Sequence, residues 1–147
     1  MEACQHWAEQ CQNHWLYLTH ADLLPNPCQD TPWQWLYGGQ NDCAFIITMG
    51  FNTASFTAIL CGFEAVWNST PIPHDNVSTA TPQIHCRSLD VAGALGLVLH
   101  YLNSTMHKIS LEEIFALIPS TTPQYVVLSL QILCETLSTT PDASIKW

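Results

Sequence analysis

Hydrophobic residues recur at intervals of three and four along most of the chain, and no segment shows the alternation that is typical of a β-strand. Between residues 110 and 118, four of them fall on one helix face: Leu111, Ile114, Phe115 and Ile118. Ser110 and Glu113 form a capping box, which predicts that this helix begins at Leu111. Pro119 cannot continue a helix, so we expect the helix to end near Ile118.

A second helix is predicted after a turn of three residues. Thr122 is a favoured N-cap residue, and Pro123 suits the first helical position because its missing N–H needs no partner there. The predicted buried stripe consists of Val126, Leu130, Leu133 and Leu137. The opposite face carries Gln124, Val127, Leu128, Gln131 and Glu135. The pair predicts a helix-turn-helix at about 110–137, whose second helix would present that opposite face to the major groove of DNA.

The N-terminal part of the chain predicts several further helices. The first covers about residues 3–20, with an apolar face formed by Trp7, Cys11, Trp15 and Leu18. A short helix opens at Pro32 after the N-cap Thr31, carries Trp33, Leu36 and Tyr37, and is closed by Gly38 and Gly39. We therefore expect two amphipathic helices before residue 40.

Asparagine caps mark the next two helices. Asn41 predicts a helix over residues 42–49 that ends at Gly50. A longer helix follows from Asn52 or Thr53, with one face made of Phe56, Ile59, Leu60, Phe63 and Trp67. This helix is strongly amphipathic, so we expect that face to pack against the core.

Residues 68–87 contain three prolines among polar residues and predict a long exposed connection. After it, Ser88 is expected to cap a helix over residues 89–102 that is apolar on nearly every side and must be surrounded by other helices. The prediction is an all-α, multi-helix fold. It consists of an N-terminal helical segment (1–67), the connection (68–87) and a three-helix unit (88–147) that contains the helix-turn-helix.

The charge balance disfavours strong binding to nucleic acid. The 147 residues carry three Lys plus Arg against twelve Asp plus Glu, a formal net charge of −9. Nucleic-acid-binding proteins draw most of their affinity from neutralising phosphates. All three cations lie in the C-terminal part, at Arg87, Lys108 and Lys146. Only 10% of residues are charged while 48% are hydrophobic, so either marginal solubility or a partner that covers apolar surface is expected.

No pattern of catalytic or cofactor-binding residues is found. The chain has no glycine-rich phosphate loop, no nucleophile elbow and no recognisable Cys and His spacing, so no catalytic residue, cofactor or metal is predicted. Cys4, Cys11 and His14 share one side of the predicted first helix and leave a zinc site conceivable, although core packing beside Trp7 and Trp15 explains them better. The seven cysteines are interpreted mainly as buried free thiols.

The sequence also predicts a location. No run of eighteen apolar residues occurs, and the N-terminus has neither a basic start nor an apolar signal core. We therefore expect a nuclear or cytoplasmic protein that is not secreted and does not bind a membrane.

Four segments resemble the region upstream of the catalytic domain in fungal transposases of the Harbinger type. They are TPWQWLYGGQNDCAFIITMGF (31–51), VWNSTPIP (66–73), RSLDVAGALGLVLHYLNSTMHKISLEEIFALIPS (87–120) and LCETLSTTPDASIKW (133–147). The resemblance spans about residues 18–147 and is most specific from Arg87 onward. It implies a helix-turn-helix module that recognises transposon ends or supports assembly. The catalytic domain of this DDE superfamily, with its acidic triad, would follow Trp147, so the resemblance implies no enzymatic activity for this chain.

One departure from the family pattern concerns DNA affinity. Relatives tend to carry a basic residue at the start of the second helix, where this chain has Pro123 and Gln124, so binding to double-stranded DNA is expected to be weak or lost. Gln124 and Gln131 could still each read an adenine edge. The candidate DNA-binding residues are Arg87, Lys108, Thr121, Thr122, Gln124, Leu128, Gln131 and Lys146. The alternative is a helical protein–protein interaction module that pairs with itself or with a separate catalytic domain.

Overall fold

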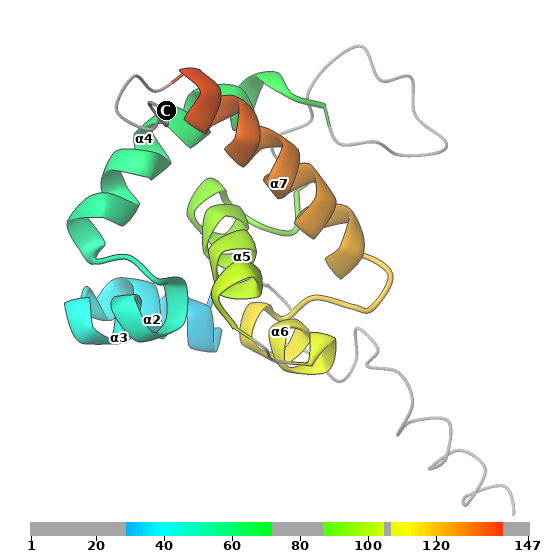
Figure 1. Ribbon diagram of the computed structural model, residues 1–147. Coiled ribbons are helices and arrows are strands. Elements are labelled where there is room, and N and C mark those ends of the chain that lie inside the picture. The colour runs from blue at the N-terminus through cyan, green and yellow to red at the C-terminus, as the bar shows by residue number, and fades with distance from the viewer. Residues whose placement is uncertain (1–28, 72–86, 105–106, 140–147) are drawn as a thin grey trace, which may run out of the picture.

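The computed structural model describes residues 29–71, 87–104 and 107–139, and these residues form α-helices, with no strand among them (Figure 1). The all-α prediction is therefore confirmed, and a helix-turn-helix is compatible with the arrangement. The predicted helix over residues 3–20 lies outside the described residues. The helices are α2 (Pro32–Gly39), α3 (Asp42–Met49), α4 (Thr53–Ser69), α5 (Val91–Asn103), α6 (Lys108–Phe115) and α7 (Thr122–Thr139).

Helices α2, α3 and α4 begin where their side-chain caps predict. The Thr31 hydroxyl accepts from the backbone N–H of Gln34 at 3.2 Å. The side-chain oxygen of Asn41 accepts from Ala44 N–H at 3.1 Å, and that of Asn52 accepts from Ser55 N–H at 2.9 Å. Each cap satisfies one of the N–H groups that a helix leaves without an internal partner. Gly50 ends α3 with a positive φ of 79°, as predicted, whereas α2 is closed by Gln40 rather than by its two glycines.

Helix α5 is the centre of the described fold and packs against the five other helices (Figure 1). Residues 92–100 are all buried, which confirms that this apolar helix is surrounded. Its predicted cap was wrong: Asp90 caps α5 by accepting from Gly93 N–H at 2.7 Å. Ser88 lies two residues before this cap, and its backbone N–H donates to the Tyr125 hydroxyl at 2.7 Å, which ties the start of this segment to α7.

An aromatic cluster joins α2 to the helices around α5. Trp33 is fully buried and stacks on Phe115 of α6, with ring centroids 5.3 Å apart, and it also contacts Phe56 of α4 at 6.0 Å. The Trp33 indole lies directly against Gly96 of α5, where there is no side chain to displace it. Helices from both sides of the connection at 68–87 therefore share one hydrophobic core.

Helix α6 differs from its prediction at both ends. It begins at Lys108 rather than Leu111, with His107 as an N-cap that makes no side-chain bond, so the predicted capping box was wrong. The extra turn lets the Lys108 ammonium reach the Pro119 carbonyl oxygen at 3.0 Å. The helix ends at Phe115 because Ala116 takes a left-handed conformation, φ 50°, and the chain turns to bury Leu117. Six residues, 116–121, rather than three thus separate α6 from α7.

The buried face of α7 is rotated from the predicted stripe. The predicted face treated Leu128 as exposed and Leu137 as buried, but Leu128 is 5% exposed and Leu137 is 39% exposed. The reason is close packing against α4, where a Cβ at Gly62 would lie only 2.9 Å from the Thr136 methyl group. Small polar residues, which a prediction based on hydrophobic periodicity leaves out of the buried face, therefore lie toward the core. The buried residues of α7 are Thr122, Tyr125, Val126, Leu128, Ser129, Ile132, Leu133 and Thr136.

Candidate functional site

The outer face of α7 keeps only part of the predicted DNA-reading set. Gln124 and Gln131 are exposed there, together with Val127 and Glu135. Leu128 is buried and cannot contact a base, so that assignment was wrong. Thr122 is also buried, and its hydroxyl donates to the Ile118 carbonyl oxygen at 3.1 Å instead of capping the helix. Thr121 is half-buried in the connection before α7.

Arg87 is a structural cation rather than a phosphate contact. Its guanidinium is buried, lies 4.4 Å from the centre of the Trp67 ring, and donates to the carbonyl oxygens of Trp67 at 2.8 Å and Thr70 at 2.6 Å. These carbonyls belong to the C-terminal end of α4, which attracts positive charge. Burial lowers the pKa of Arg87, although a guanidinium remains charged at any physiological pH. The prediction of a phosphate contact at Arg87 was therefore wrong. At the ends of the predicted connection over residues 68–87, Asn68 and Ser69 belong to α4 and Arg87 is buried, and residues 72–86 lie outside the described residues.

Lys108 is exposed, but its charge has local partners. Its ammonium lies 3.7 Å from a carboxylate oxygen of Glu112 and donates to the Pro119 carbonyl oxygen. These contacts join the first turn of α6 to the connection before α7. The third cation of the chain, Lys146, lies outside the described residues. No cation in the described ranges is therefore both exposed and without an anionic or carbonyl partner.

Two buried titratable groups lie on facing helices near this connection. His100 of α5 is buried and meets the Phe115 ring edge-on, with centroids 6.3 Å apart. Burial lowers the His100 pKa from its ordinary value of 6.5. On α6, burial raises the pKa of the Glu112 carboxyl, while Lys108 acts in the opposite direction. In both residues, burial disfavours the charged form of the side chain.

The His100 environment predicts a loss of stability on acidification. Because burial lowers the pKa of His100 in the folded protein, neutral His100 makes its full contribution to stability above the unfolded pKa of about 6.5. This contribution is lost as the pH falls through the folded pKa. Urea unfolding at pH 7.5 and pH 5.5 should show a smaller drop in the free energy of unfolding for His100→Gln than for the unmodified chain. Equal drops in the two proteins would contradict this account.

Helix α3 presents an apolar surface that packs against no other described helix. Its inward residues Phe45 and Met49 are buried against the core. The residues at i, i+3 and i+4 on its other side are exposed, and we call them the outward face of α3: Cys43, Ile46 and Ile47. Ile47 is 76% exposed and Ile46 is 52% exposed. A helix that is apolar all round is normally buried, so an exposed one indicates a contact surface.

Hydrogen bonds at both ends fix the position of α3. At its N-terminus, the Asp42 carboxylate accepts from the Thr53 backbone N–H at 3.0 Å and from the Thr53 hydroxyl, and these bonds lower the Asp42 pKa. At its C-terminus, the Asn103 side-chain amide donates to the Ile47 carbonyl oxygen at 3.0 Å. The outward face of α3 is therefore held in place by its neighbours α4 and α5.

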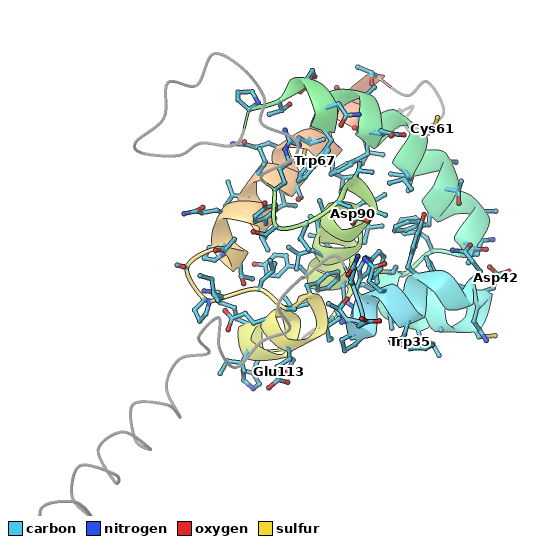
Figure 2. The ribbon with its side chains drawn as sticks, turned by 180° about the vertical axis from the view of Figure 1, so that it is seen from behind. Trp35, Asp42, Cys61, Trp67, Asp90 and Glu113 are labelled. Carbon is cyan, nitrogen blue, oxygen red and sulfur yellow. The ribbon has the colours of Figure 1, made fainter. Side chains whose placement is uncertain are left out.

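A second exposed apolar feature lies on α2. Trp35 is 76% exposed and is labelled on the surface in Figure 2. It lines an open hollow of about 470 Å³ together with Asp30, Gln34, Gly38 and Gly39. The hollow contains one carboxylate, no cation and no cluster of nucleophilic groups, so nothing in it indicates catalysis.

The described cysteines do not follow the expected pattern. Cys43, Cys61 and Cys134 are free and exposed, so the prediction of buried thiols is wrong for these three. The described residues contain no group of three or more His, Cys, Asp or Glu that could hold a metal ion. The conceivable zinc ligands Cys4, Cys11 and His14 lie outside the described residues.

The described helices were also compared with the requirements for crossing a membrane. No single helix within the described ranges is long and apolar enough to cross one. Helices α3 and α4 meet the length and composition criteria only as a pair, and they are bent by 61° relative to one another.

Comparisons with protein-family models, with curated proteins and with solved structures found no match for this chain. The resemblance to Harbinger-type transposases therefore stays a prediction.

The outward face of α3 was not predicted from the sequence. Cys43, Ile46 and Ile47 are spaced as one helix face, and so are Phe45 and Met49 on the other side. A helix of eight residues with two apolar faces indicates that one of the faces is exposed, and this pattern could have been read from the sequence. Only the packing of α5 shows which of the two faces is covered.

Proposed function

We propose that this chain is a non-catalytic helical module that acts by binding protein, of the kind that precedes the catalytic domain in Harbinger-type transposases. The observation that carries the proposal is the outward face of α3, because it leaves two isoleucines exposed on a helix that hydrogen bonds hold at both ends. Burying such side chains against a partner yields about 1.5 to 3 kcal/mol for each one that becomes fully covered.

The electrostatics support protein rather than phosphate as the partner. Arg87 is buried and directed at backbone carbonyls, and Lys108 already contacts Glu112 and Pro119. The exposed carboxylates of a chain with a net charge of −9 repel a phosphate backbone. Without exposed cations, a helix-turn-helix lacks the counterion release that supplies most non-specific DNA affinity.

The test compares two kinds of partner under one set of conditions. The full chain is mixed with a purified Harbinger-type catalytic domain, with more of itself, or with a pool of random DNA duplexes at about 50 mM salt, a condition that favours electrostatic binding. We expect association in at least one protein mixture and no retention on the duplexes. Retention on DNA without any protein association would overturn the proposal.

A specific observation favours DNA reading as a second candidate function. Gln124 and Gln131 are both exposed on the outer face of α7, two helical turns apart, and a glutamine can bond an adenine in a bidentate way. In that case the duplex pool should be enriched for a short motif, and Gln124→Ala should abolish the enrichment. Glu135 on the same face would oppose phosphate, so the expected affinity is low.

A further inference from the structure

We propose that the hollow beside Trp35 on α2 binds an arginine side chain from a basic segment of a partner protein. This Trp35 hollow has a volume of about 470 Å³ and is lined by Asp30, Gln34, Trp35, Gly38 and Gly39. Its ligand is a cation, because the lining offers an aromatic ring and a carboxylate and contains no cation. The inference goes beyond the proposed function, since the hollow is a second contact site that does not involve the outward face of α3.

The packing of α2 fixes the residues of the Trp35 hollow on the outer side of the helix. Trp33 is fully buried in the aromatic cluster, and a step of two residues turns an α-helix by about 200°. Trp35 is therefore directed away from the core, and it is 76% exposed. The Thr31 hydroxyl accepts from Gln34 N–H, and the Thr31 carbonyl oxygen accepts from Trp35 N–H at 3.2 Å. The first turn of α2 thus holds the backbone beneath the hollow in place.

A contact inside this fold shows which groups hold a guanidinium. Arg87 lies 4.4 Å from the centre of the Trp67 ring and donates to the carbonyl oxygens of Trp67 and Thr70. The face of the ring attracts the cation, and the oxygens accept its N–H groups. The hollow offers the same two kinds of group, because Trp35 supplies an exposed indole and Asp30 supplies an exposed carboxylate. A guanidinium suits both, since it is planar and carries five N–H donors.

The described residues of the chain supply no cation to the hollow. Arg87 is buried in the contacts given above, and Lys108 is paired with Glu112. The last turn of α2 contains no basic residue, although the carbonyl groups at the C-terminal end of a helix attract positive charge. The hollow reaches this turn at Gly38 and Gly39. These observations favour a partner as the source of the cation.

The surface charge favours a basic partner over an acidic one. Within the described ranges, six exposed carboxylates stand against one exposed cation, Lys108. The six are Asp30, Asp42, Glu64, Asp90, Glu113 and Glu135. A surface of this sign attracts basic segments at long range and repels acidic ones, including other copies of this chain. The ring and the carboxylate of the hollow then bind the arginine at short range.

The experiment titrates the full chain with an acetylated peptide of sequence Gly-Arg-Gly-Arg-Gly and follows the indole N–H signals by NMR. Trp35→Phe identifies the Trp35 signal, because that variant lacks it. We expect this signal to shift, with a dissociation constant on the order of 100 µM, since an open hollow covers only part of the ligand. A matched peptide carries citrulline in place of arginine, which keeps the shape and removes the charge. It should leave the signal unshifted.

Two variants of the hollow test its residues. Trp35→Ala should weaken binding of the arginine peptide about fivefold or more, because the ring face is lost. Asp30→Asn should weaken it about two- to fivefold, and asparagine tolerates the left-handed backbone of Asp30, φ 57°. Glu113→Gln is the matched control, because it removes one exposed carboxylate from α6, a different helix from that of Trp35 (Figure 2). This control should change the dissociation constant by less than about twofold.

The outcomes bear on the hollow and on the outward face of α3 separately. Equal weakening by Asp30→Asn and Glu113→Gln would reveal diffuse attraction to an acidic surface and overturn the site. An unshifted Trp35 signal, equal binding of the citrulline peptide, or full affinity in Trp35→Ala would overturn it as well. None of these results affects the proposed function, which depends on the exposed isoleucines of α3. Ile47→Asp tests that function instead, and it should leave binding of the arginine peptide unchanged.

Discussion

Replacing Gly96 by alanine is expected to destabilise the protein by about 3 kcal/mol, the upper end of the range for overpacking a core. A Cβ at this position would lie 2.3 Å from Cη2 of Trp33, and two more atoms of the same ring lie within 2.8 Å. Trp33 is fully buried and packs against Phe115 and Phe56, so the indole cannot move away without shifting those rings. The overlap outweighs the gain of about 1 kcal/mol that alanine brings to a helix interior.

Gly39→Ala is the matched control for this prediction. Gly39 lies in α2, and nothing is found within 4 Å of a Cβ built there. The same substitution at this position should raise the free energy of unfolding by about 0.5 to 1 kcal/mol. Urea denaturation of the two variants measures both effects.

A double variant tests the cause assigned to Gly96. Trp33→Leu removes the ring that the new methyl group would overlap, at a cost of its own. If the overlap is the cause, Gly96→Ala should cost less in the Trp33→Leu background than in the unmodified chain. Equal costs in the two backgrounds would contradict the proposed contact.

Removing the Arg87 side chain should also cost about 3 kcal/mol, even though this cation lies at the end of a connection rather than in a helix. Arg87→Ala leaves the carbonyl oxygens of Trp67 and Thr70 without their guanidinium donors and exposes the face of the Trp67 ring. Each buried acceptor without a partner costs about 1 to 3 kcal/mol. The contact of the cation with the ring adds to this loss.

Arg87→Lys is the matched variant, because it keeps the charge and loses the planar fork. A lysine cannot bond both carbonyl oxygens with a planar fork and also lie flat on the Trp67 ring, so we expect roughly half the loss seen for Arg87→Ala. Thermal unfolding followed by circular dichroism measures both variants. If Arg87 were instead a phosphate contact, Arg87→Ala would change duplex retention and leave the melting temperature unchanged.

Much of the fold follows from local sequence. Thr31, Asn41 and Asn52 each start a helix where predicted, since a side-chain cap involves only residues three apart in the chain. The burial of residues 92–100 follows from their composition alone, because a helix with no polar face must be surrounded. The exposure of Gln124 and Gln131 was likewise predicted from helical periodicity.

Other features depend on contacts between residues far apart in the chain. The start of α6 at Lys108 involves its bond to Pro119, and the Tyr125 hydroxyl accepts from the Ser88 N–H just before the cap of α5 at Asp90. Leu128 became buried because the fit between Gly62 and Thr136 rotates α7 against α4. A pattern of hydrophobic residues cannot predict such a rotation, because it depends on how closely two helices approach.

The sequence by itself determined the helical class, the N-caps of α2, α3 and α4, and the central place of α5, because these depend on residues within one helical turn or on uniform composition. The tertiary structure decided which charges and which apolar faces meet solvent. It placed Arg87 on Trp67 and left Ile47 exposed. The exposure of a residue depends on which other residues pack against it. Those neighbours often come from distant parts of the chain, and they are determined only when the helices pack together.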